Sequence, residues 1–338
     1  MTKLTGATLV LSFHALLFLP PAARAASTQQ TGRVTESDHV QVVDWSSRGV
    51  QHVYGLPDAK VKDKGTLTLS EAGLSFTGKA SSSMIPRQSV VAVSAGNERV
   101  EIWGMKGQVL RAVIPNGGGV AAAMFMHHRV DMLTVEFADN HGGYHGAVFF
   151  LPAKEASRAL ESFSKRPIVP REAQSNVCQD SFVRPHSMLL SAPTWDQAQV
   201  PAAYRALVYE RLLDRLRQVQ GVEHVYRDGE NNAEQGCPQY TMHLSISGFK
   251  EGNQVKRAVM GPAGFFVGTT QMKFEATVTD ASGKVAMQEQ VKATTRGETE
   301  STNVATNVAK KLAKDYSEVV KKTNESELAA SRGMPRKR

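Results

Sequence analysis

The sequence predicts a mainly β first domain and an α+β second domain, joined by a proline-containing linker. Apolar and polar residues alternate along several short runs of the first half, which is typical of half-buried strands. In the second half, two longer segments repeat apolar residues at helical spacing instead. A chain of 338 residues is also long enough for roughly two domains, each with its own core.

The first 25 residues have the pattern of a secretory signal peptide. Lys3 precedes an uncharged apolar run over residues 7–19, and the small-x-small pattern of residues 23–25 follows two prolines. The apolar run is too short to cross a bilayer, which needs about 20 apolar residues. We therefore expect cleavage after Ala25, a flexible mature end over residues 26–39, no later transmembrane segment, and a periplasmic or secreted protein. The alternative is a buried N-terminal helix.

The formal charge of +8 is concentrated near the two ends of the chain. Lys3 and Arg24 leave with the signal peptide, and residues 328–338 hold four cations and no acid, so residues 26–327 carry only +2. No basic stripe is interleaved with aromatic residues, which disfavours nucleic acid as a partner. Residues 326–338 are predicted to form a disordered basic tail, with weak binding to anionic lipid or cell-wall polymer as an alternative role.

Residues 40–166 are predicted to form a meander or barrel of short antiparallel strands with one C-terminal helix. Leu67, Leu69, Leu74 and Phe76 alternate with polar residues on either side of a turn, which predicts a hairpin. Further strands are expected at residues 85–93, 100–103, 109–114, 132–137 and 147–151. The helix, over residues 154–163, has one apolar face. The segment Gly117–Met126 is either a short helix or a flap.

This first domain resembles the GRAM or bacterial pleckstrin-homology-like domains over residues 64–166. The phrases that carry the resemblance are GTLTLSEAGLSFTG, IPRQSVVAVSAG, LTVEFAD and AVFFLP, followed by the helix. These segments are expected to form turns and strands, so the resemblance implies an arrangement of strands followed by one closing helix.

Residues 167–177 form the predicted linker, which Pro167 and Pro170 stiffen. Residues 178–325 then alternate strand and helix patterns in the order β-α-β-β-β-β-α. The expected strands are 182–190, 222–226, 240–248, 269–279 and 285–295, and the expected helices begin at Pro201 and at Ser301 or Thr302. This order predicts an antiparallel sheet with both helices on one face.

The second domain resembles, over residues 180–322, an uncharacterised family of bacterial envelope proteins that are often lipoproteins. The matching phrases are ALVYERLLDRLRQVQGVEHV, LSISGFKEGNQVKRAVMGPAGF and MKFEATVTDASGKVAMQEQV. The family is similar in layout to the amino-terminal domain of the Tol translocation protein and to lipoprotein activators of penicillin-binding proteins. The resemblance implies a role in protein–protein binding or assembly of the cell envelope, and no catalytic residues. The lipidated cysteine usual in this family is absent after the leader of this chain.

The two cysteines, Cys178 and Cys237, both belong to the second domain. An isolated pair in an oxidising compartment predicts a disulfide, and two buried thiols are the alternative.

Four histidines lie within 19 residues of the first domain: His127, His128, His141 and His145. They are weak candidates for a metal site, because the two glycines between His141 and His145 disfavour the helix that would align them. Solvated loop histidines are the alternative interpretation. We expect no metal and no cofactor.

No other motif indicates catalysis. The sequence contains no GxSxG elbow, no Walker lysine and no convergent pair of carboxylates. The Gly-rich turn after Arg257 either lets two strands cross closely or presents Phe265 and Phe266 to a partner protein.

The resulting expectation is a non-enzymatic exported module that binds or assembles another envelope protein. The alternative is a metal-binding protein or metal-dependent enzyme that uses the four histidines.

Overall fold

The computed structural model describes residues 43–101, 127–165, 182–195, 198–230, 236–252, 269–295 and 302–333. The predicted signal peptide, the mature end, the linker and the segment Gly117–Met126 lie outside these ranges. The chain beyond Val40 forms one compact unit. No helix within the described ranges combines the length and apolar character needed to cross a bilayer.

The first half of this unit is a seven-stranded antiparallel sheet with the strand order β4-β3-β2-β1-β7-β6-β5. Its strands are β1 (Val43–Tyr54), β2 (Lys64–Ser70), β3 (Gly73–Gly78), β4 (Ser82–Pro86), β5 (Val90–Glu101), β6 (His127–Ala138) and β7 (Tyr144–Leu151). Strands β1 to β4 pair in succession, strands β5 to β7 do the same, and β1 joins these two meanders by pairing with β7. Because β4 and β5 are its two edges, the sheet is an open meander rather than a closed barrel.

The alternation seen in the sequence buries one set of side chains beneath helix α3 (Glu155–Ser164). Leu67, Phe76 and Phe149 are fully buried, and Ala159 and Phe163 of α3 join the same apolar cluster. The predicted helix that closes the first half of the chain is therefore present. The predicted strand at residues 109–114 lies outside the described residues.

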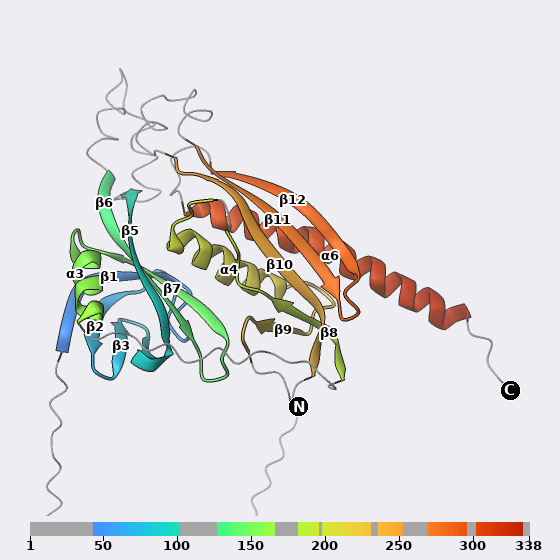
Figure 1. The fold of residues 1–338 in the computed structure, drawn as a ribbon, viewed down its shortest axis with the longest axis horizontal. Coiled ribbons are helices and arrows are strands. Elements are labelled where there is room, and N and C mark those ends of the chain that lie inside the picture. Colours follow the sequence, from blue (N-terminus) through green and yellow to red (C-terminus); the bar gives the residue numbers. More distant parts are fainter. Residues whose placement is uncertain are drawn as a thin grey trace, which may run out of the picture. The chain divides into compact units, whose positions relative to one another are not determined.

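The second half is a five-stranded sheet with the order β12-β11-β10-β8-β9 and two helices (Figure 1). Its elements are β8 (Val183–Leu190), α4 (Ala202–Leu216), β9 (His224–Arg227), β10 (Cys237–Lys250), β11 (Thr270–Asp280), β12 (Val285–Thr295) and α6 (Asn303–Gly333). This is the predicted order of elements.

The prediction that this sheet is wholly antiparallel was wrong. β8 runs parallel to both of its neighbours, β9 and β10, while β10, β11 and β12 pair antiparallel. The reason is the connection through α4: a helix that crosses the sheet returns the chain in the direction of the first strand, whereas a tight hairpin reverses it.

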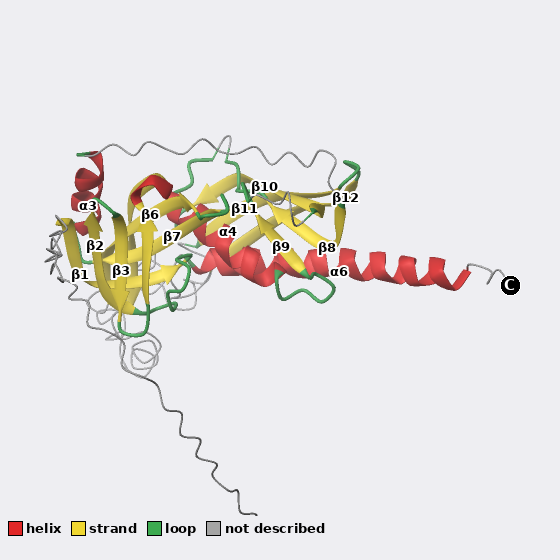
Figure 2. Cartoon of the chain, turned by 90° about the horizontal axis from the view of Figure 1, so that it is seen from below, coloured by secondary structure: helices red, strands yellow, loops and turns green. Residues whose placement is uncertain are grey.

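Both helices cover the same face of the second sheet. Met242, Leu244 and Ile246 alternate along β10 and share one apolar core with α4 and α6. Helix α6 buries Val320 in this core, and it continues to Gly333 and extends beyond the strands (Figures 1 and 2). The prediction of a disordered tail from residue 326 was therefore wrong for residues 326–333, where Glu, Leu and Ala favour helix.

Helix α4 lies in the middle of the compact unit, because it also contacts strands of the first sheet. Its core cluster includes Met132 of β6 and Val148 and Phe150 of β7. The helix is consequently buried on nearly all sides. The two predicted domains thus share a core instead of forming separate bodies on a stiff linker, and we call the surface between β7 and α4 the sheet junction.

Candidate functional site

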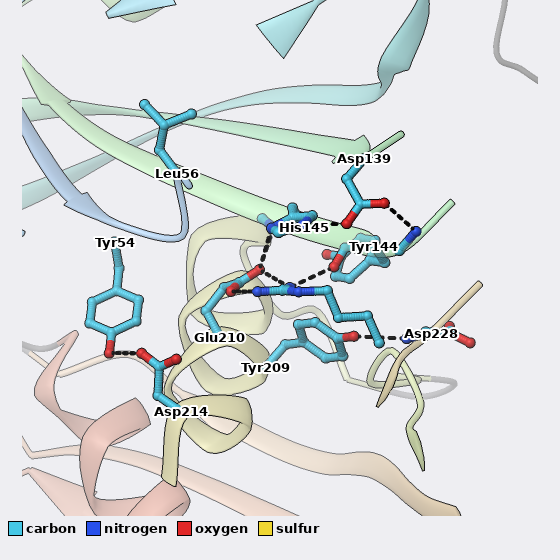
Figure 3. A network of polar contacts seen from close by, with 12 residues as sticks. Tyr54, Leu56, Asp139, Tyr144, His145, Tyr209, Glu210, Asp214 and Asp228 are labelled. Atoms are coloured by element: carbon cyan, nitrogen blue, oxygen red, sulfur yellow. Dashed lines mark hydrogen bonds and ion pairs between the residues drawn. The ribbon is translucent and has the colours of Figure 1, made fainter. Parts of the chain in front are cut away.

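The polar residues of the sheet junction form a network that links β7, α4 and β9 (Figure 3). The turn between β6 and β7 meets the end of β9, where the amide of Tyr144 donates to the carbonyl of Asp228 over 2.8 Å. Gly142 and Gly229 face each other so closely that a Cβ on Gly142 would lie 2.6 Å from the carbonyl oxygen of Gly229. The two turns can approach this closely because neither glycine carries a side chain.

Glu210 and Arg227 form a bidentate ion pair at the centre of the network. The Arg227 Nη1 and Nη2 atoms donate to Glu210 Oε1 and Oε2, each over 2.9 Å. Their side chains are only 4% and 9% exposed. Burial alone would lower the pKa of Arg227, but the bonds to Glu210 outweigh it and hold that pKa above its ordinary value. The pair therefore remains ionised inside the protein.

Each member of this pair also bonds to the first sheet. Glu210 Oε1 accepts the amide hydrogen of Gly146 over 3.0 Å, and Arg227 Nη1 donates to the carbonyl of Tyr144 over 2.8 Å. The ion pair thus fastens the backbone of β7, at Tyr144 and Gly146, to α4 and β9. Its geometry is that of a structural clamp.

His145 lies beside this clamp and faces two carboxylates. Its Nε2 atom is 3.1 Å from Asp139 Oδ2, and its Nδ1 atom is 3.7 Å from Glu210 Oε1. The ring stacks on Phe137 with a centroid separation of 4.9 Å and an interplanar angle of 11°. The ring is therefore fixed in place by packing as well as by polar contacts.

Asp139 is the acidic anchor of the turn between β6 and β7. Its Oδ1 atom accepts the amide hydrogens of His141 and Gly143, over 2.8 and 2.9 Å. Burial would raise the pKa of this carboxyl, but the hydrogen bonds from His145, Gly143 and His141 outweigh burial and lower the pKa to about 2. Because the folded-state value lies below the ordinary 3.8, the carboxylate stabilises the fold above about pH 4 and loses this contribution as the pH falls toward 2.

We expect Asp139→Asn to make stability less sensitive to acid in this window. The asparagine oxygen can still accept from the turn amides but does not titrate, so the loss of stability from about pH 4 to about pH 2 becomes shallower than in the wild type. Thermal melting monitored by circular dichroism at several pH values measures this slope. Asp58→Asn, on an exposed loop, is the control, and an unchanged slope for the Asp139 variant would contradict the assignment.

A cleft of about 490 Å³ opens beside the network. Its rim includes Tyr54, whose hydroxyl donates to Asp214 over 2.5 Å. Burial, and then this bond, raises the pKa of Tyr54 well above its ordinary value, so the hydroxyl keeps its proton. The residues that line the cleft are His52, Tyr54, Gly55, Leu56, Pro57, Ala59, Val61, Asp139, His141, His145, Glu210, Asp214, Arg217, Arg227 and Glu230.

The chemistry that this lining offers is limited. It contains no serine, threonine, cysteine or lysine among the described residues, so the groups that could act as nucleophiles are its carboxylates, its histidines and Tyr54. Glu210 already accepts three hydrogen bonds, and Asp139 accepts from two amides and contacts His145. The carboxylates therefore hold the fold together in this conformation.

His52 was not singled out by the sequence, although it shapes the cleft wall. Its Nε2 atom accepts the amide hydrogen of Leu56, and its Nδ1 atom bonds to the carbonyl of Lys60, each over 3.1 Å. Burial lowers the pKa of His52, so a neutral ring holds the loop between β1 and β2. A histidine two residues before a Tyr-Gly turn is too common a pattern to have predicted this role.

The structure does not bring the four predicted histidines together. Phe137 pairs with His145 across β6 and β7, and His128 lies nine residues earlier along β6, which is roughly 30 Å away in an extended strand. His127 is one residue farther, while His141 is in the turn and lines the cleft. No group of three or more His, Cys, Asp or Glu side chains within the described ranges has the arrangement of a metal site.

The remaining predicted residues are only partly described. Cys237 is buried at the start of β10, and its amide donates to the carbonyl of Phe182 over 2.8 Å. Cys178 lies outside the described residues, so the disulfide stays a prediction. Arg257, Phe265 and Phe266 also lie outside them, between β10 and β11.

No protein-family model and no curated protein matches this chain. Among solved structures, it is similar to the crystal structure of a Xanthomonas campestris protein of the DUF330 family, at 11% sequence identity. The alignment covers 48% of this chain and 94% of the other, with a TM-score of 0.26. A TM-score this low does not establish a shared fold. None of the comparisons supports the predicted likeness of residues 64–166 to GRAM or pleckstrin-homology-like domains.

Proposed function

We propose that this chain is a non-enzymatic exported protein that binds another protein of the bacterial cell envelope. The signal-peptide pattern of residues 1–25 supports export to that compartment. The hydrogen bonding of Glu210 and Arg227 at the sheet junction supports a scaffold rather than a catalyst, since these two charged side chains already hold the fold together.

The observation that carries the binding role is the outer edge of β12. This strand has eleven residues, and within the described residues it pairs with β11 alone. The outer edge of such a strand presents backbone N–H and C=O groups that an extended segment of a partner can pair with. Val285, Gln288 and Glu289 are exposed along this strand.

Site-specific photocrosslinking tests the proposal. A photoreactive amino acid placed at Gln288, in the full chain expressed with its leader, is expected to capture an envelope protein in whole cells. The same group at Phe265, which lies between β10 and β11 in the sequence, tests the predicted aromatic contact. The matched control is Lys314, which is exposed on α6.

Two results would overturn the proposal. One is equal crosslinking from Lys314 and from the β12 position, because a specific edge contact must depend on position. The other is robust turnover, in a screen of hydrolase substrates, that is lost on replacing His145 or Cys237.

A further inference from the structure

Among the buried atoms of the described residues that lack a hydrogen-bond partner is one on the ring of His145, in the sheet junction. The Nδ1 atom of His145 exposes less than 1 Å² and has no partner among the described residues. The nearest acceptor is Glu210 Oε1, at 3.7 Å. Buried polar atoms of this kind are rare in folded proteins and call for a physical explanation.

The protonation state of the ring supplies that explanation. A neutral imidazole has one N–H, and placing it on Nε2 lets the ring donate to Asp139 Oδ2 over 3.1 Å. The lone pair of Nδ1 then faces the carboxylate of Glu210, and two acceptors oppose each other. A second proton turns Nδ1 into a donor, so that one ring bridges two carboxylates.

Three charged groups surround the ring. Asp139 in the turn and Glu210 on α4 are negative, and Arg227 on β9 is positive, so these three groups carry one net negative charge. The other groups around the junction are partnered among themselves: Glu136 of β6 contacts Tyr144 and Arg205, and His52 of β1 bonds to its own loop.

We propose that His145 is a pH-sensitive latch between the two sheets. When the ring gains its second proton, it donates to Asp139 and to Glu210 and so ties β7 to α4. When the ring loses that proton at higher pH, the contact with Glu210 becomes repulsive and the sheet junction loosens. The proposal concerns regulation of the fold and does not depend on the identity of a binding partner.

The test compares the melting temperature of the wild type with that of His145→Gln between pH 5.5 and pH 8. Because only the doubly protonated ring can donate to both carboxylates, the latch stabilises at the acidic end and its contribution disappears as the pH rises. The advantage of the wild type over the variant is expected to shrink by about 3 °C across this range. His141→Gln is the matched control: this histidine is on the same turn, is exposed, and contributes only its amide to the network.

Subtracting the melting temperature of His145→Gln from that of the wild type at each pH cancels the contribution of other histidines to the pH dependence. Burial lowers the pKa of His52, so its neutral form favours folding and its contribution has the opposite sign. A constant difference between wild type and His145→Gln at every pH would overturn the latch and leave His145 as a packing residue. Should the variant fail to fold, nitrogen NMR of the wild-type ring decides the matter. A titration in which Nδ1 gains a proton, together with a shift of the Gly146 amide, supports the latch, and an Nδ1 that stays unprotonated at pH 5.5 overturns it.

Discussion

Replacing Arg227 with methionine is expected to lower the free energy of unfolding by about 3–5 kcal/mol, because the change leaves the carboxylate of Glu210 buried without its counter-ion. Methionine keeps most of the apolar stem of arginine, so the loss reports the charge rather than the packing. The carbonyl of Tyr144 loses a donor at the same time. Urea denaturation followed by circular dichroism measures the change.

Two further variants separate the cost of an unpaired buried charge from the cost of replacing any arginine by methionine. The double variant Arg227→Met with Glu210→Leu removes both charges and is expected to be more stable than Arg227→Met alone, since no buried ion remains. Arg217→Met removes an arginine that is 48% exposed, 3.8 Å from Asp214, and is expected to change stability by less than about 1 kcal/mol. Equal effects for Arg227→Met and Arg217→Met would contradict the role of the clamp.

The sequence predicted those helices and strands whose formation depends on residues close together in the chain. The period-two run from Leu67 to Phe76 predicted the hairpin of β2 and β3, and the apolar stripe from Val304 to Val319 predicted α6. Strand direction in the second sheet was harder, because the pattern of β8 is the same whether its neighbours are parallel or antiparallel. The chain connection through α4 contains that information, and the prediction did not use it.

The sheet junction could not be predicted in the same way, since its contacts join residues far apart in sequence. Glu210 bonds to the amide of Gly146, which is 64 residues earlier in the chain. One signal was nevertheless present. Four apolar residues, 206–209, directly precede Glu210 in ALVYERLL, and a carboxylate buried in such surroundings requires a partner. Arg227, directly after the apolar strand residues Val225 and Tyr226, was the available cation.

Gly55→Ala is expected to destabilise the protein by about 3–5 kcal/mol, the sum of backbone strain and a steric clash. Gly55 has a φ of +85°, which is unfavourable for alanine, and a Cβ there would lie 2.0 Å from the carbonyl oxygen of Gly146. Gly146 cannot move away, because its own Cα faces Ala206 of α4: a Cβ built on Gly146 would lie 2.5 Å from the Ala206 Cβ. The close approach of three backbone segments thus fixes the position of β7 against α4.

Gly49→Ala separates the two contributions. Gly49 has a similar φ of +72°, but a Cβ there meets nothing within 4 Å. Its substitution carries only the backbone strain, about 1–2 kcal/mol. The difference between the two variants, measured by urea denaturation, therefore gives the free-energy cost of the clash at the sheet junction. If both variants lose the same stability, the junction accommodates the added methyl group by moving β7, and the rigid contact between β7 and α4 inferred from Gly55, Gly146 and Ala206 is wrong.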